Sequence, residues 1–249
     1  MGFSLDEALG KIGTAGYTGI DGLKRLVSET SAIVANAAPD ATLLLYSGKV
    51  GDAYAWDVAA RASNSSIDAN GLKQVVTIAD TPVYKLLNDA VFKNALKDAV
   101  GGVDQTYNLL MDGKDATGAR ISNTSLWDTA SKNLASSATG DILTFTPNAP
   151  IDGVFMQTEV DAALNSRAPT INGIPREDLV RLKNDLLASG STDIAAKGIL
   201  FDRINTASAE QTRALTLAAD ARGNLSSVGT KDYLALCEIE WVIEFHFSA

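Results

Sequence analysis

Cysteine and histidine are almost absent from this sequence, which has one of each, Cys237 and His246. A single cysteine cannot form a disulfide within the chain, so the fold depends on its core and is compatible with a reducing compartment. One cysteine and one histidine are also too few for the ligand sets that hold zinc. We expect Cys237 to be a buried strand residue, because it follows the apolar residues 234–236. The sequence therefore predicts no metal centre.

Positive charge is in the minority. The chain has 21 Lys and Arg against 30 Asp and Glu, which gives a net charge of −9 at pH 7. Affinity for nucleic acids comes mainly from neutralising backbone phosphates with basic side chains, so this balance argues against a nucleic-acid partner.

Long apolar runs are also missing. A membrane-spanning helix needs about 20 consecutive apolar residues, and no stretch of the sequence approaches that length. The first residues, from Met1 to Glu7, have neither the basic nor the apolar region of a secretory signal peptide. We therefore expect no membrane partner and no signal peptide, and a protein that is cytoplasmic or is delivered into a target cell.

The composition itself is that of a globular protein, with 46% hydrophobic and 20% charged residues. Short apolar or β-branched runs bounded by turn residues predict strands at 41–48, 75–78, 140–145 and 154–160. Apolar residues at helical spacing predict helices over 54–62, 83–96 and 122–138. This alternation of helices and strands favours an α/β fold.

Three segments differ in their pattern. Residues 1–40 are expected to form an N-terminal helical segment with a glycine-rich bend between two helices. Residues 41–165 contain the alternating elements of a small central β-sheet domain, on which we expect the N-terminal helices to pack. Residues 166–249 are expected to contain helices over 176–188 and 206–222, and a closing strand over 233–247.

Glu159 and Trp127 each allow a structural and a functional interpretation. In the expected strand 154–160, Glu159 alternates with Phe155 and Gln157, as on the solvated face of a half-buried strand. A tryptophan on a helix, such as Trp127, is commonly a core residue. Taken alone, both patterns favour the structural interpretation. The motifs described below favour the functional interpretation for Glu159 and leave the two interpretations of Trp127 evenly balanced.

Three motifs, taken together and in this order, resemble the ADP-ribosyl cyclase family of NAD-consuming enzymes. The first is Leu45-Tyr46-Ser47-Gly48, where the family has an aromatic residue and a serine at the end of a strand. The second is 77–89, similar to a family segment of the form Thr-Leu-acid-Asp-Thr that leads into a helix. The third extends from Trp127 to Glu159, where the family has a helix that begins with Trp and, further on, Phe-x-x-x-Glu on a strand. The resemblance covers about half of the chain, roughly residues 43–164.

This resemblance implies a central domain of ADP-ribosyl cyclase type that cleaves the nicotinamide–ribose bond of NAD, with Glu159 as the catalytic carboxylate. Nicotinamide is already cationic in NAD, so its departure needs no general acid, unlike the leaving group of an ordinary glycoside. Glu159 would hold the ribose hydroxyls and stabilise the positive charge that develops on the ribose in the transition state. NAD is then a substrate and no cofactor is expected.

Six further residues are implied to bind the substrate: Tyr46, Ser47, Asp80, Trp127, Ser131 and Phe155. Trp127 would offer a flat apolar face to the nicotinamide ring, with Tyr46 and Phe155 packed around it. Ser47 and Ser131 would donate hydrogen bonds to ribose or phosphate oxygens.

The sequence departs from the family pattern in ways that bear on the product and on the biological setting. Ala79 stands where many members have an acid that influences the balance of cyclisation and hydrolysis, although the neighbouring Asp80 is retained. This difference favours hydrolysis to ADP-ribose and nicotinamide. Tyr46 stands where the family has Trp. The lack of disulfides, which secreted animal members have, fits a bacterial toxin or effector whose partner would be an immunity or host protein.

Two other functions stay open from the sequence. The chain could be a non-catalytic interaction module in which the helical ends form the partner surface and the three motifs are core. It could also transfer ADP-ribose to a protein, a reaction that likewise uses a glutamate on a strand.

Overall fold

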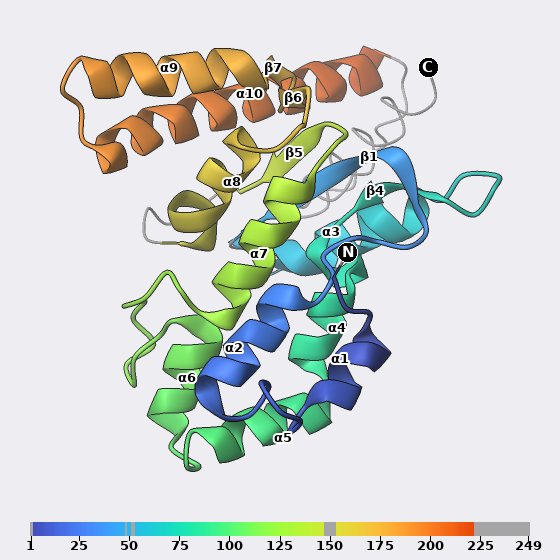
Figure 1. Cartoon of the computed structure of the whole chain (residues 1–249). Helices are drawn as coiled ribbons and strands as arrows, with labels where there is room; N and C mark the ends of the chain where they lie inside the picture. The colour runs from blue at the N-terminus through green and yellow to red at the C-terminus, as the bar shows by residue number, and fades with distance from the viewer. Residues whose placement is uncertain (1, 48, 51–52, 147–152, 222–249) are drawn as a thin grey trace.

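The computed structural model describes residues 2–47, 49–50, 53–146 and 153–221 (Figure 1). The expected closing strand 233–247, with Cys237 and His246, lies outside the described residues.

A five-stranded sheet lies at the centre of the fold, with the strand order β4-β1-β5-β6-β7. Its strands are β1 (Ala37–Tyr46), β4 (Lys73–Val76), β5 (Ile142–Phe145), β6 (Thr170–Ile171) and β7 (Ile174–Pro175). The first four strands in this order are parallel, and β7 pairs with β6 in the antiparallel sense. A separate two-stranded ribbon consists of β2 (Lys49–Val50) and β3 (Ala53–Tyr54). Helices connect the parallel strands, so the expected α/β class is confirmed.

Helices make up most of the remaining described residues. They are α1 (Leu5–Lys11), α2 (Gly19–Glu29), α3 (Ala55–Ser65), α4 (Pro82–Asn88), α5 (Ala90–Ala99), α6 (Asp104–Asp112), α7 (Leu126–Ser137), α8 (Val160–Leu164), α9 (Arg176–Ala188) and α10 (Asp193–Ala221). A short 3₁₀ turn, η1 (Ile78–Asp80), precedes α4, and a turn of π-helix, η2 (Phe155–Glu159), precedes α8.

Strand β1 is buried on both faces, which explains its uninterrupted apolar run. Leu43 and Leu45 belong to the largest cluster of buried residues, which includes helices on one side of the sheet. Leu44 points to the other side, where it packs with Ala59 and Ala62 of α3. The larger cluster extends from Ala8 to Ile204 and therefore contains residues from all three segments of the chain.

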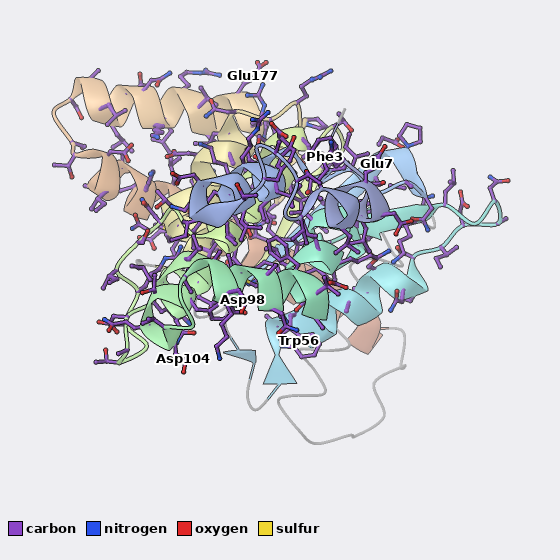
Figure 2. All side chains as sticks on the ribbon, turned by 60° about the horizontal axis from the view of Figure 1, so that its bottom comes forward. Phe3, Glu7, Trp56, Asp98, Asp104 and Glu177 are labelled. Atoms are coloured by element: carbon purple, nitrogen blue, oxygen red, sulfur yellow. The ribbon has the colours of Figure 1, made fainter. Side chains whose placement is uncertain are left out.

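The two N-terminal helices pack mainly on other helices. α1 contacts α4, and α2 contacts α5 and α7, so these helices gather at the end of the molecule drawn at the bottom of Figure 1. Ser4 and Glu7 form a capping box at the start of α1, and Figure 2 labels Phe3 and Glu7 on this part of the surface. The Phe3 amide donates to the Glu29 carbonyl over 2.7 Å, which ties the start of the chain to the end of α2.

Several expected boundaries differ from the structure. The expected helix 83–96 is two helices, because Asp89 ends α4 and caps α5 by accepting a 3.0 Å hydrogen bond from the Phe92 amide. Helix α6 was not expected, and α10 begins well before the expected residue 206.

The expected strand 154–160 is wrong, because these residues form η2 and the start of α8. Phe155, Met156, Thr158, Glu159 and Val160 are all buried, so the segment has no solvated face with a period of two. Glu159 is therefore neither on a strand nor exposed to solvent.

Candidate active site

The connections between the strands create a point where a ligand site is expected. From β1 the chain crosses to β4 at one side, and from β5 it crosses to β6 at the other, so the crossovers leave the adjacent strands β1 and β5 in opposite directions. In open parallel sheets, ligands bind outside the carboxyl ends of the strands at such a switch point.

A pocket of about 220 Å³ lies at this carboxyl edge. Four of its residues follow one another at the end of β1, and the others come from η1, α4, α7, the last residue of η2 and the residue before η2. The lining residues are Leu44, Leu45, Tyr46, Ser47, Ile78, Tyr84, Trp127, Ser131, Leu134, Val154 and Glu159. Five of the seven residues expected at the site, Tyr46, Ser47, Trp127, Ser131 and Glu159, are thus brought to one pocket.

Glu159 presents a buried carboxyl group to this pocket. The residue is 6% exposed, and its Oε2 atom has no hydrogen-bond partner among the described residues. Burial raises the pKa of Glu159 to about 7. A hydrogen bond from Ser131 acts to lower this pKa, the nearby Asp128 carboxylate raises it, and the Arg120 guanidinium lowers it. Near neutral pH the side chain can therefore change charge in response to a ligand.

The π-helical turn determines where Glu159 lies. An extra residue in a helical turn is commonly found at functional sites, because it redirects a side chain without ending the helix. In η2, Phe155 and Met156 are buried in the core, whereas Glu159 lines the pocket. Phe155 itself packs on Phe201 of α10 with ring centroids 5.9 Å apart. Phe155 is therefore a core residue and does not line the pocket.

Aromatic side chains from three elements line the pocket. The rings of Trp127 and Tyr84 meet at an angle of 60° with their centroids 5.5 Å apart. Burial raises the pKa of Tyr46 above its ordinary range, with further contributions from Tyr84, Glu159 and Asp80, so its hydroxyl stays neutral. Trp56, by contrast, is 51% exposed on α3 and lies outside the pocket (Figure 2).

Helix α7 presents two of the expected residues together. Trp127 and Ser131 are four residues apart and therefore lie on the same face of the helix. Ser125 begins the helix with a capping box in which Asp128 accepts from the Ser125 amide over 2.9 Å. Local capping thus sets the start of α7, and the helical period then brings Trp127 and Ser131 to one wall.

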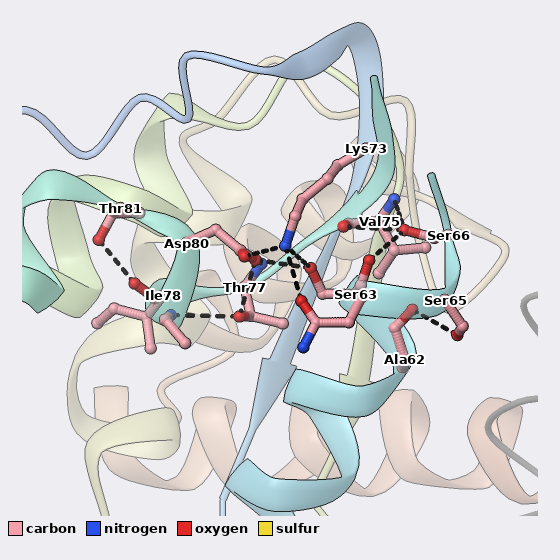
Figure 3. Close-up of polar contacts among 12 residues, drawn as sticks. Ala62, Ser63, Ser65, Ser66, Lys73, Val75, Thr77, Ile78, Asp80 and Thr81 are labelled. Atoms are coloured by element: carbon pink, nitrogen blue, oxygen red, sulfur yellow. Dashed lines mark hydrogen bonds and ion pairs between the residues drawn. The ribbon is translucent and has the colours of Figure 1, made fainter. Parts of the chain in front are cut away.

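Asp80 lies beside the pocket in a polar cluster with Lys73 and Ser63 (Figure 3). Its carboxylate forms an ion pair with Lys73 and accepts hydrogen bonds from the Ser63 hydroxyl and the Thr77 amide, both over 2.8 Å. Lys73 also donates to Ser63 over 2.9 Å and to Asn64 over 3.2 Å. The oxygens of Asp80 are thus engaged within the protein, and Asp80 is not among the lining residues.

Sequence reasoning missed three residues of this region. Tyr84 lines the pocket although it was not singled out in the motif 77–89. The sequence feature that could have identified Tyr84 is its position just after Thr81 and Pro82, which mark the start of helix α4. This helix follows the carboxyl end of β4. The buried Asp128 and the largely buried Arg120 form an ion pair that acts electrostatically on Glu159, and no pattern in the sequence connects them.

No group of three or more His, Cys, Asp or Glu side chains that could hold a metal ion occurs in the part of the chain that the structure describes. Within the same residues, no helix is both long and apolar enough to span a membrane.

Comparison with known proteins gave no match for this chain among family models, curated proteins or solved structures.

Proposed function

We propose that this chain cleaves the nicotinamide–ribose bond of NAD and releases ADP-ribose and nicotinamide. One observation carries the proposal: a buried glutamate with an unpartnered carboxylate oxygen opens into an aromatic-lined pocket at the switch point of a parallel sheet.

The pocket suits a flat cationic group. A buried carboxylate oxygen without a hydrogen-bond partner, such as Oε2 of Glu159, is costly, and a ligand cation offsets that cost. Aromatic faces attract cations as well, and Tyr46, Tyr84 and Trp127 supply such surfaces around Glu159. The pyridinium ring of NAD is both flat and positively charged. A volume of about 220 Å³ is below the ~300 Å³ of typical ligand sites, so we place the nicotinamide ribose in the pocket and the rest of NAD outside it.

The reaction would proceed without a general acid. The bond from the ribose C1′ atom to the ring nitrogen breaks, and its electron pair leaves with nicotinamide, which becomes neutral. Positive charge then appears on the ribose, where the Glu159 carboxylate stabilises it more strongly than in the ground state. Water adds to C1′ and loses a proton to solvent, giving ADP-ribose.

The finer parts of the proposal follow the sequence motifs. The central domain would be of ADP-ribosyl cyclase type, and the protein would act as a bacterial effector or toxin that depletes NAD, countered by an immunity or host protein. Ala79 follows Ile78, a lining residue, and brings no acid to that side of the pocket. We therefore favour hydrolysis over cyclisation.

The test is release of nicotinamide from NAD by the purified chain. Glu159→Gln keeps the shape but removes the charge, so it should lower the rate on the order of 10² to 10³-fold. Glu177→Gln is the matched control, because Glu177 is an exposed glutamate on α9 (Figure 2). Chromatography should show nicotinamide and ADP-ribose in near-equal amounts, with cyclic product as a minor species. A Glu159→Gln variant with unchanged turnover would refute the assignment. With NAD labelled in its ADP-ribose part, label on a protein instead of in free ADP-ribose would indicate transfer to a protein.

A further inference from the structure

Asp128 occupies a junction between the two helical walls of the pocket. It is 1% exposed and lies at the third residue of α7, next to Trp127. Its Oδ2 atom accepts from the Ser125 amide over 2.9 Å and from the Ser125 hydroxyl over 2.6 Å, which completes the cap of α7. Its Oδ1 atom is therefore available for groups outside its own helix.

Two groups from other segments meet that Oδ1 atom. The Thr158 hydroxyl on η2 donates to it over 3.3 Å. Arg120, from the segment between α6 and α7, forms an ion pair with the same atom through its Nη2 group. Thr158 directly precedes Glu159, so Asp128 connects the start of α7 to the turn that carries the glutamate.

Asp128 and Arg120 also act on the charge of Glu159. The charged groups that act on Glu159 are Asp128 and Arg120, and the titratable hydroxyl of Tyr46 faces it from β1. Arg120 is itself incompletely satisfied, because its buried Nε atom lacks a hydrogen-bond partner in the described part of the chain. Among those residues, the buried side-chain atoms without a partner are Arg120 Nε and Glu159 Oε2. Both belong to this one cluster of opposite charges.

We infer that Arg120 and Asp128 are positioning residues for Glu159, which hold its turn against α7 through Thr158 and set the charge balance beneath its carboxylate. The inference rests on the proposed function only in taking Glu159 as the reacting carboxylate. Neither residue is among those that line the pocket, so they act through Glu159 and not on the substrate.

Opposite shifts of the Glu159 titration would distinguish this role from a merely structural ion pair. Asp128→Asn removes a negative neighbour and should lower the Glu159 pKa, whereas Arg120→Met removes a positive one and should raise it, each by about one pH unit. The double variant removes both charges, so its Glu159 pKa should lie between those of the single variants. The double variant also leaves no unpaired buried charge. If a single variant does not fold, the Glu159 pKa can therefore still be compared between the double variant and the wild type.

The titration is measured by carbon NMR of the chain labelled at glutamate carboxyl groups, with Glu159→Gln assigning the signal. Asp104→Asn is the control, because it breaks an exposed 3.2 Å ion pair with Lys97 that joins α5 to α6. Figure 2 labels Asp104. It should leave the Glu159 signal unmoved. This readout needs no substrate.

Activity provides the second readout. Thr158→Val keeps both charges but breaks the link to Asp128, so kcat for NAD should fall about 10-fold with little change in KM. Shifts in the same direction for Asp128→Asn and Arg120→Met, or none in either, would overturn the inference. A chain that releases no nicotinamide but shows the opposite shifts would refute the proposed function and leave the charge coupling standing.

Discussion

Tyr84 and Trp127 come from different helices, yet their rings meet 5.5 Å apart at the pocket that contains Glu159. Tyr84 lies in the first turn of α4 and Trp127 in the first turn of α7. The starts of the two helices are thus held together at the carboxyl edge of the sheet. This contact places two aromatic rings beside a buried carboxylate, and both features attract cations.

Trp127 should contribute mainly to binding. Trp127→Phe reduces the aromatic surface area at the pocket, so we expect a higher KM for NAD with little loss of thermal stability. Steady-state kinetics and a melting curve measure the two effects. Trp56→Phe, on the outer side of α3, is the control and should change neither. A large fall in the melting temperature of Trp127→Phe, with unchanged kinetics, would show that Trp127 is structural.

The buried Glu159 carboxyl should make the protein less stable as the pH rises. Its pKa is about 7 in the folded chain, against an ordinary value of 4.5, so between these values the folded state binds more protons than the unfolded state. The free energy of unfolding should then fall across that window by up to about 3 kcal/mol. Glu159→Gln cannot titrate, so its stability relative to the wild type should rise between pH 5 and pH 8. Urea unfolding at both pH values tests this, and a pH-independent difference would contradict it.

The same group should govern the pH dependence of catalysis. The ionised carboxylate is the form that stabilises a cationic transition state, so kcat/KM for NAD should fall as the pH drops below about 7. Bound pyridinium favours the charged carboxylate, so the midpoint for kcat should lie at lower pH than that for kcat/KM. Rate measurements from pH 5 to pH 9 give both midpoints. Identical midpoints would mean that the bound pyridinium does not interact electrostatically with Glu159.

Asp80 should be required for stability. Asp80→Asn leaves the largely buried Lys73 ammonium without its ion-pair partner, and breaking such a pair typically costs about 3 to 5 kcal/mol. Denaturant unfolding measures the loss, and Asp104→Asn, at an exposed pair, should cost less than about 1 kcal/mol. A stable Asp80→Asn protein with a raised KM for NAD would place Asp80 among the substrate-binding residues.

Local sequence patterns were sufficient for much of the fold. The apolar run within 41–48 predicted a strand, and the structure has β1 (Ala37–Tyr46) there. Apolar residues at helical spacing predicted a helix over 122–138, within which α7 lies, and helix α9 covers the expected residues 176–188. The motifs also selected five residues that line one pocket. Each of these inferences depended on neighbours within a few residues, where backbone geometry links sequence to structure directly.

Tertiary structure decided what those patterns could not. The segment 154–160 contains both β-branched and aromatic residues, and only its burial against α7, α8 and α10 makes it helical and turns Glu159 into the pocket. Phe155 and Asp80 were expected at the site from the same three motifs. In the structure, however, Phe155 packs on Phe201 and Asp80 forms an ion pair with Lys73, and neither lines the pocket. Arg120, Asp128 and Tyr84 likewise gain their roles from the crossover that brings α4, α7 and η2 to one edge of the sheet. A periodic pattern determines which face of an element is apolar, whereas the order of parallel strands determines which elements that face meets.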